Sequence, residues 1–439
     1  MRFHVLGIGS IGTLVAHHLR RTLPPTDHLS LIVRKERNGF IPKNAPSSLI
    51  VELDGVRSYV RGGFDTEWAE SSQEAVSRLV QMLKDEQMRK EVEKVDKLQR
   101  LKNSLEMSPL GKHIDVLIVT TKANKTLQAI QQCRERLSRN STIVLLQNGM
   151  GIYETVVDNL FPLAQERPNF ILATTTHGAW KKRDVADAHH VVHAGKGELH
   201  FGIVPDSFPT RQRDFERSFW NVPSDTPVSE RILSLGDIED AEAASSAVSE
   251  VLEGSKYASL RRTVAALLAL DLDTKWQPIS QLQIRLRQKV SINSSVNPLT
   301  ALLGCRNGDL LGSTHARSLV RSVCHEAADV FRQQTLAQGG EGTDEWLFGG
   351  GQASSGGMQA LSPGVLERET YKVIKATSQN YSSMLLDMER GSVLEVDFMN
   401  GYISRLGQAY NVPTPTIDAL RHAVLIKASF RRVSRVVRL

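Results

Sequence analysis

Short apolar runs alternate with helical stretches through the first two thirds of the chain. Residues 2–8 predict a strand, and the helical pattern "TLVAHHLRRTL" follows a glycine-rich turn. Further strands are predicted at residues 29–34, 49–60, 114–123, 141–151, 169–180, 189–204 and 267–276. Strands that alternate with helices are typical of a parallel α/β sheet, so we expect one here.

After Trp276 the pattern changes to a helical periodicity that dominates to the C-terminus. We therefore predict two domains, an α/β domain over residues 1–276 and an all-helical domain over residues 277–439. A chain of 439 residues is long enough to give each of them a core.

Three segments interrupt this plan and indicate insertions. Residues 66–110 are rich in Glu, Lys, Gln and Arg around a helical apolar repeat, which predicts a solvated helix and leaves a partner helix open. Residues 205–245 are rich in Pro, Ser, Asp and Arg and predict a loop. Residues 337–365 contain a Gly/Ser-rich stretch, which favours disorder over a mobile lid.

The composition is ordinary for a globular protein, with 41% hydrophobic and 23% charged residues. No apolar run approaches the ~20 residues of a membrane helix, and the N-terminus predicts a strand rather than a signal peptide. Cys133, Cys305 and Cys324 match neither a disulfide framework nor a zinc site, which indicates a reducing compartment. We expect a cytoplasmic protein, with a mitochondrial location left open.

The net charge of +6 fits either a nucleic-acid or membrane partner, or a preference for small anions. The dense basic cluster "KASFRRVSRVVRL" at the C-terminus has no interleaved aromatic platform, which favours a solvated helix end. We expect a small-molecule substrate, no nucleic-acid or membrane partner, and leave a homodimer open.

Three histidines form an "HHxxH" run at His189, His190 and His193. No carboxylate or cysteine stands at ligand spacing around them. We therefore predict surface histidines on a strand or loop, and no metal site.

Gly7, Gly9 and Gly12 form a G-x-G-x-x-G pattern that follows a strand and opens a helix. The first glycine allows a tight turn, the second lets a pyrophosphate approach, and the third lets the helix pack on the sheet. The positive end of the helix, at Ser10 and Ile11, would then meet the phosphates. The sequence therefore predicts a Rossmann-type domain that binds a dinucleotide.

The second predicted strand ends in Arg34, followed by Lys35, where an NAD site would place an acid. Two cations attract a 2′-phosphate and offer no acceptor to a ribose hydroxyl. We therefore predict NADPH rather than NADH. Lys125 could face the same phosphate, and a solvated lysine is an equal alternative.

Lys289, Asn293 and Asn297 are spaced four apart, which places them on one face of a helix. Asparagine is a poor helix former, so these residues form either a buried polar network or a site. Pro298 disfavours helical geometry at Asn297 and predicts a bend there. Reduction of a carbonyl by hydride needs a proton donor, and a lysine beside a carboxylate can supply it, so a site is favoured.

With these motifs together, the sequence resembles the ketopantoate reductase family. The likeness rests on separated motifs in the family's order: "GIGSIG" near residue 7, "TTKA" at 120–123, "LLQNGMG" at 145–151, "KVSINSSVNPLTALLGCRNGDL" at 289–310 and "SSMLLDMERGSVLEVDFMNGYISRLG" at 382–407. The family reduces 2-dehydropantoate (ketopantoate) to D-pantoate with NADPH, in pantothenate and coenzyme A biosynthesis. The resemblance implies this activity, and a helical C-terminal domain like that of 6-phosphogluconate dehydrogenase.

The resemblance also implies roles for the matched residues. Lys289 matches the catalytic lysine that protonates the carbonyl oxygen, and Glu395 matches the carboxylate that orients the active site beside the cofactor. The residues matched to substrate binding are Asn293, Asn297, Ser383 and Asn148. The residues matched to cofactor binding are Arg34, Lys122 and Asn148, the last lying between nicotinamide and substrate. Asn307 matches a family position whose role is less defined. The alternative for Asn307 is that it merely caps a helix, because Asn before Gly suits a turn.

Two other interpretations stay open. One is a reductase of another 2-keto acid with the same lysine chemistry. The other is a non-catalytic dinucleotide-binding regulator or RNA-binding scaffold, which intact Lys289 and Glu395 disfavour. In the favoured interpretation the cleft between the domains holds the nicotinamide, and we expect it to close before hydride transfer.

Overall fold

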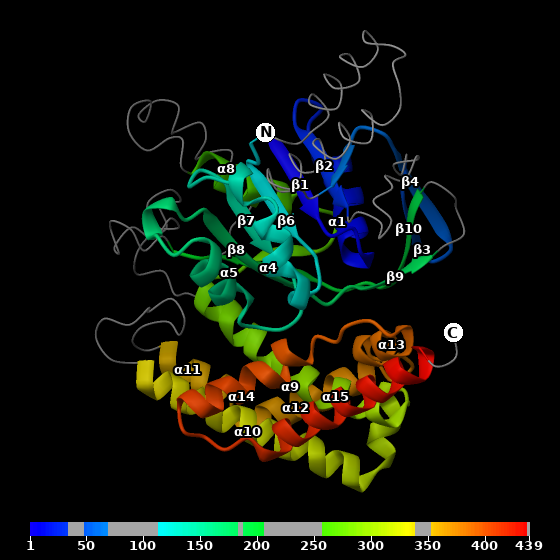
Figure 1. Ribbon diagram of the computed structural model, residues 1–439, viewed down its shortest axis with the longest axis vertical. Coiled ribbons are helices and arrows are strands. Elements are labelled where there is room, and N and C mark those ends of the chain that lie inside the picture. The colour runs from blue at the N-terminus through cyan, green and yellow to red at the C-terminus, as the bar shows by residue number, and fades with distance from the viewer. Residues whose placement is uncertain (34–47, 69–112, 183–187, 206–256, 339–352, 437–439) are drawn as a thin grey trace, which may run out of the picture.

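The computed structural model describes residues 1–33, 48–68, 113–182, 188–205, 257–338 and 353–436. An α/β part stands above a helical part in the view of Figure 1. Arg34, Lys35 and most of the three predicted insertions lie outside the described residues. Within the third insertion, Ala353–Ala360 forms helix α11 and another helix begins at Pro363, so the disorder predicted from the Gly/Ser composition is wrong for this part.

The α/β part is built on one large, mostly parallel sheet. Its strands are β1 (Arg2–Leu6), β2 (His28–Val33), β5 (Asp65–Trp68), β6 (Val116–Val119), β7 (Thr142–Leu145), β8 (Asn169–Thr175), β11 (Leu199–Ile203) and β12 (Thr274–Trp276). Their order is β12-β11-β8-β7-β6-β1-β2-β5, and only the β8–β11 pair is antiparallel among these described strands. The predicted parallel sheet is confirmed.

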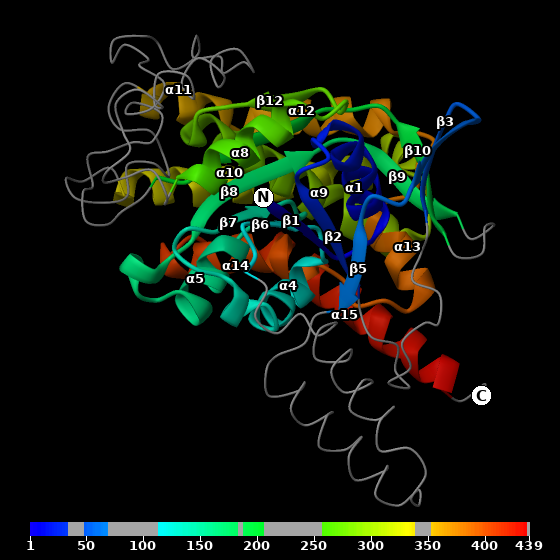
Figure 2. The ribbon, with the colours of Figure 1, turned by 90° about the horizontal axis from the view of Figure 1, so that it is seen from above.

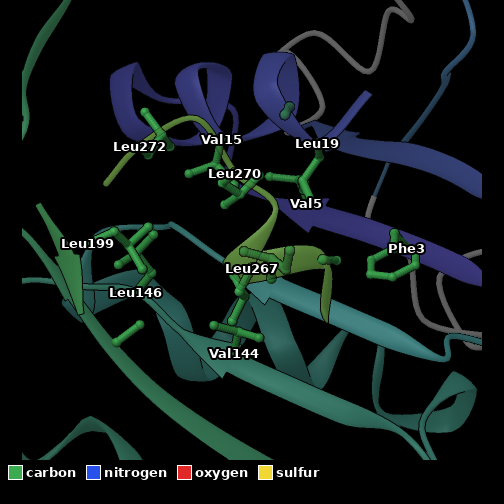
Figure 3. Packing of buried hydrophobic residues seen from close by; sticks show 14 of the residues in the cluster. Phe3, Val5, Val15, Leu19, Val144, Leu146, Leu199, Leu267, Leu270 and Leu272 are labelled. Atoms are coloured by element: carbon green, nitrogen blue, oxygen red, sulfur yellow. The ribbon is translucent and has the colours of Figure 1, made fainter. Parts of the chain in front are cut away.

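Helices cover both faces of this sheet because its strands are apolar on both sides. Helices α1 (Ser10–Thr22) and α8 (Ala258–Leu268) pack on one face, where Val5, Val15 and Leu267 belong to one core (Figure 3). Helices α4 (Ala123–Gln131) and α5 (Ile152–Leu160) pack on the other face (Figure 2). Two short 3₁₀ turns, η1 (Arg134–Arg136) and η2 (Ala164–Glu166), follow α4 and α5.

A second, four-stranded sheet lies beside α1 and was not predicted. It contains β3 (Ser48–Leu53), β4 (Val56–Arg61), β9 (Gly178–Lys182) and β10 (Ala188–Gly195), in the order β4-β3-β10-β9. Asp54 and Gly55, both at positive φ, turn the chain between β3 and β4, as hairpin residues do. Three of the predicted strand regions, 49–60, 169–180 and 189–204, therefore each contain two strands.

The strand predicted at 267–276 is wrong for most of its length. Helix α8 includes Leu267 and Leu268, and only Thr274–Trp276 joins the sheet. A short apolar run fits a buried helix as well as a buried strand, and periodicity alone does not distinguish them.

The helical part begins at Ile279, three residues after Trp276. It comprises α9 (Ile279–Leu303), η4 (Asn307–Gly312), α10 (Thr314–Gln338), α11, α12 (Pro363–Ala376), α13 (Ser383–Arg390), η6 (Val396–Phe398), α14 (Asn400–Ala409) and α15 (Pro415–Val436). The first turn of α9 packs in the core of the sheet, and its later turns pack in the core of the helical part. Among the described helices, none has the length and apolar character to cross a membrane.

Helix α9 runs through Pro298 without ending, so the predicted departure from helical geometry at Asn297 is wrong. Proline has no N–H, which leaves the carbonyl of Ser294 without its helical donor. The side chain of Asn400 replaces it, because its Nδ2 donates to the Ser294 carbonyl at 3.0 Å. A residue about a hundred positions away in the sequence thus keeps the helix continuous.

Candidate active site

The glycine turn between β1 and α1 has a distinct physical reason for each glycine. Gly7 lies at φ +98°, in the left-handed region, and a Cβ there would lie 2.7 Å from the main-chain nitrogen of Thr121. A Cβ on Gly12 would overlap the Gly7 carbonyl oxygen. A Cβ on Gly9 would meet nothing within 4 Å. Packing therefore requires the outer glycines, and the middle one leaves open space.

The first turn of α1 fits an anionic group at that open space. Ser10 and Ile11 lie in this turn, where the helix leaves main-chain N–H groups without helical acceptors. The turn carries no acidic side chain and no side-chain cap among the described residues. The positive end of the helix therefore faces the space beside Gly9, which suits a pyrophosphate.

The two lysines predicted near the cofactor are placed differently from one another. Lys122 is the N-cap residue of α4, and its Nζ forms an ion pair with Asp387 of α13, which spans the two parts of the molecule. Lys125 is exposed on the first turn of α4. Arg34 lies outside the described residues, so the structure does not test the 2′-phosphate prediction.

Lys289 of α9 reaches the carboxyl end of β8. Its Nζ donates to Thr174 Oγ1 at 2.9 Å and to the Thr175 carbonyl at 2.8 Å. An ammonium group has three N–H donors, so one donor remains for a substrate atom. Burial lowers the pKa of Lys289 to about 8, although the negative charge of Glu395 acts in the opposite direction.

Glu395, the residue before η6, reaches the N-terminus of α4. Its Oε1 accepts a hydrogen bond from the Ala123 N–H at 2.8 Å. Burial raises the pKa of Glu395, while that hydrogen bond and the charge of Lys122 partly oppose the rise. Glu395 and Lys289 act on each other's pKa but form no direct ion pair in the described structure, so their coupling is through space.

The predicted asparagines differ in how far their hydrogen-bonding capacity is used. Asn293 is partly buried one turn beyond Lys289, and Asn148 is partly buried in the loop after β7. Asn297 is buried, with Nδ2 3.7 Å from the Met399 Sδ. For Asn293 and Asn148 the described residues show no hydrogen bond to either side chain, so both amides are available to a ligand.

The loop that carries Asn148 is attached to the helical part. Gly149 lies at φ +90°, and a Cβ there would lie 2.5 Å from the Phe398 carbonyl oxygen. The Met150 N–H donates to the same oxygen at 2.9 Å. This contact brings Asn148 to the segment that contains Glu395.

Ser383 and Asn307 have contrasting environments. Ser383 is exposed at the start of α13. Its neighbour Ser382 caps that helix, and the Ser382 hydroxyl accepts a hydrogen bond from Thr300 Oγ1 at 2.7 Å. Asn307 is buried, and its Nδ2 donates to Thr377 Oγ1 at 2.9 Å. Asn307 therefore joins η4 to the turn after α12 rather than capping a helix.

The histidine run is mostly buried, so the surface prediction is wrong. His190 Nε2 lies 3.2 Å from Glu52 Oε2, and His193 Nε2 lies 3.0 Å from His177 Nδ1. The run lies on β10, an inner strand of the second sheet, which no local pattern indicated. Within the described ranges, no group of His, Cys, Asp and Glu could hold a metal ion.

Three contacts of the site were missed. Thr174 and Thr175 hold Lys289 from the end of a predicted strand, and Asp387 pairs with Lys122. Ligands of open α/β sheets bind outside the carboxyl ends of the strands, so polar residues at such an end are a signal for a site. Nothing in the sequence pairs that strand end with a lysine more than a hundred residues later.

Two family models match the chain. The model described as Ketopantoate reductase PanE/ApbA matches residues 71–206, and the model described as Ketopantoate reductase PanE/ApbA C terminal matches residues 282–428. The chain belongs to the ketopantoate reductase family. The predicted family is therefore confirmed.

Named relatives agree with this assignment. A probable 2-dehydropantoate 2-reductase of Schizosaccharomyces pombe is 26% identical over 92% of this chain and 90% of its own length. The 2-dehydropantoate 2-reductase of Vibrio cholerae is 27% identical over 70% of this chain and 76% of its own length.

Solved structures share the fold at low sequence identity. A PanE/ApbA family ketopantoate reductase from Ralstonia eutropha aligns with a TM-score of 0.58 and 16% identity, over 98% of this chain and 100% of that one. A D-mandelate dehydrogenase with NADH and anilino(oxo)acetate aligns with a TM-score of 0.55 and 16% identity, over 98% of this chain and 100% of that one. The predicted fold class is confirmed.

Proposed function

We propose that this protein reduces 2-dehydropantoate (ketopantoate) to D-pantoate with NADPH, and that Lys289 is the proton donor. The observation that supports the donor is its position. Lys289 projects from the helical part to the carboxyl ends of the sheet strands, on the side where the glycine turn also lies. In open α/β sheets, ligands bind outside the carboxyl ends of the strands.

The glycine turn and the first turn of α1 are the proposed holders of the pyrophosphate, because the space beside Gly9 is open. We propose Arg34 and Lys125 for the 2′-phosphate, and Lys122, Asn148 and Glu395 beside the rest of the cofactor. When bound, NADPH supplies the hydride.

Lys289 suits the role of proton donor to a carbonyl oxygen. Its pKa of about 8 keeps it protonated at neutral pH, yet close enough to neutrality to release the proton readily. Glu395 stabilises the charged form through space, and the Thr174 and Thr175 oxygens fix the position of Nζ.

The polar side chains around Lys289 are the proposed substrate holders. Asn293 and Asn297 lie along α9 on the same side as Lys289, and Ser383 begins α13. Amide groups can donate to a carboxylate and accept from a hydroxyl, both of which a 2-keto acid and its product carry. We propose that these three residues and Asn148 orient the keto acid.

We also propose that residues 1–276 and 277–439 act as two domains that close on the ligands. The contacts Glu395–Ala123 and Lys122–Asp387 join the two parts, so they are the contacts that closure would adjust. A cytoplasmic location and a homodimeric assembly are further proposals, which fractionation and analytical ultracentrifugation would test.

The test is NADPH oxidation by the purified protein, followed by absorbance. We expect turnover with ketopantoate and loss of nearly all turnover in Lys289→Ala, with NADPH binding retained. Benzoylformate, the keto acid corresponding to mandelate, is the competing substrate, because a D-mandelate dehydrogenase shares the fold. Faster turnover of benzoylformate than ketopantoate, or unchanged turnover in Lys289→Ala, would contradict the proposal.

A further inference from the structure

The two acceptors that hold Lys289 are consecutive residues at the end of β8. Thr174 contributes a side-chain oxygen, and Thr175 contributes its main-chain carbonyl. The chain leaves the main sheet directly afterwards, so the sheet fixes this end on one side only. The contacts on the other side of this strand end therefore determine how accurately the Lys289 Nζ is placed.

His177 lies two residues beyond Thr175 and uses its main chain and both ring nitrogens. Its N–H donates to Thr175 Oγ1 at 3.1 Å. Its Nδ1 accepts from the Gly197 N–H at 2.9 Å, and its Nε2 lies 2.9 Å from the Leu272 carbonyl oxygen. One ring thus joins the end of β8 to the turn before β11 and to the segment before β12.

These contacts assign the ring's tautomer. A main-chain N–H can only donate, so Nδ1 of His177 must be the acceptor. The proton therefore lies on Nε2, which donates to the Leu272 carbonyl. His193 Nε2, 3.0 Å from the same Nδ1, must then carry a proton as well.

The turn around the ring leaves little room for adjustment. A Cβ on Gly197 would lie 2.5 Å from Thr176 Oγ1 and 2.7 Å from the His177 nitrogen. The rings of His177 and His193 pack edge to face with centroids 4.8 Å apart. Thr176 also exchanges hydrogen bonds with Glu198, which closes the turn against β8.

We propose that His177 is a positioning residue for Lys289, which places the proton donor by fixing the two oxygens that hold its Nζ. This inference rests on the proposed function of Lys289 as proton donor. His177 itself does not touch the reacting atoms. An apolar side chain of similar size would fill the space but offer no partner to Gly197, Leu272 or His193.

Other charged groups act on this cluster and must be counted in any pH measurement. The charge of Glu395 acts on Lys289 through space, and several groups from neighbouring elements act on the histidines near His177. Arg21 of α1 and Asp271 before β12 act on His18 of α1, and Lys196 of the turn before β11 and Asp54 of the β3–β4 turn act on His193.

The test compares His177→Leu with His177→Asn and His177→Gln. Asparagine keeps an acceptor near Nδ1, and glutamine keeps a donor near Nε2. His190→Gln serves as the control, because His190 is a buried histidine that lies on β10 beside Glu52. The measurements are kcat, the Kd of NADPH, the melting temperature, and the pH dependence of kcat.

We expect His177→Leu to lower kcat by about ten- to a hundredfold, part of the typical contribution of a general acid, with the Kd of NADPH unchanged. The proposed donor must be protonated, so kcat should fall at high pH, and this fall is the high-pH limb of the profile. In His177→Leu the limb should move to higher pH, because water that enters a loosened site relieves the burial that lowers the pKa of Lys289. His177→Asn or His177→Gln should recover part of kcat, and His190→Gln should change neither kcat nor the limb. Equal losses in all three His177 variants, with no movement of the limb, would overturn the proposal.

A second measurement keeps this inference separate from the proposed function. The rate of Lys289 acetylation by acetic anhydride, followed by peptide mass spectrometry across a pH series, gives its titration without turnover. An upward shift in His177→Leu relative to wild type would support the positioning role even if ketopantoate is not a substrate. Identical titrations would overturn it even if ketopantoate is reduced.

Discussion

Asn400 donates a hydrogen bond of 3.0 Å to the main-chain carbonyl of Ser294, the carbonyl that Pro298 leaves without a helical donor. Asn400 is fully buried at the start of α14, and the helix it completes carries Lys289, Asn293 and Asn297. The asparagine thus maintains the geometry of the proposed site without entering it.

The first prediction concerns this contact. Asn400→Leu should lower the free energy of unfolding by about 1–3 kcal/mol, since a buried carbonyl loses its partner. Pro298→Ala supplies a main-chain N–H in its place, so Asn400→Leu should cost less in a Pro298→Ala background. Urea unfolding of the two single variants and the double variant measures the coupling. Additive costs would show that Asn400 acts independently of the proline.

The glycine turn gives a second prediction, in which neighbouring glycines respond differently. Gly12→Ala should destabilise the protein by about 1–3 kcal/mol, because its Cβ overlaps the Gly7 carbonyl. Gly9→Ala should leave the melting temperature nearly unchanged, because its Cβ meets nothing within 4 Å, yet weaken NADPH binding. Thermal melts and fluorescence titration with NADPH separate the two effects. Unchanged NADPH affinity in Gly9→Ala would remove the pyrophosphate from this position.

Patterns in the sequence predicted those features that depend on residues close together in the chain. The glycine turn and the Lys289–Asn293 spacing depend on residues a few positions apart, and both were predicted. The second sheet, the Asn400–Ser294 bond and the Lys289–Thr174 bond join distant segments, and no periodicity encodes which segments meet. The apolar run at 267–276 was assigned to a strand because a buried helix and a buried strand have the same composition there.

The third prediction concerns the pH dependence of the proposed reaction. Lys289 must be protonated to donate, and its pKa is about 8, so kcat for ketopantoate reduction should fall as the pH rises above about 8. Initial rates over a pH series with saturating NADPH and ketopantoate measure this limb. A kcat that stays constant as the pH rises from 8 to the ordinary lysine pKa of 10.5 would show that Lys289 is not the donor.

Glu395→Gln gives a fourth prediction, because it changes charge and keeps the acceptor for the Ala123 N–H. Glu395 raises the pKa of Lys289, so its neutralisation should move the high-pH limb of kcat to lower pH. The melting temperature should change little compared with Glu395→Ala, which removes the acceptor as well. A limb that stays in place would show that the two groups are not coupled.

The last prediction concerns stability rather than rate. The pKa of Lys289 is about 8 in the folded protein, whereas an ordinary lysine, as in the unfolded chain, has a pKa of 10.5. Below pH 8 both states hold the proton, and the folded state bears the full cost of burying the charge. Between these values the folded chain releases its proton first, so stability rises with pH, and above them the contribution is constant.

Lys289→Met lacks this titration. The free energy of unfolding of the wild type should therefore rise relative to that of Lys289→Met as the pH increases from about 8 to 10.5. Urea unfolding of both proteins at matched pH values measures the difference, which removes the contribution of every other titrating group common to the two. A difference that is independent of pH would mean that Lys289 keeps its ordinary pKa in the folded protein, and the third prediction would then fail with it.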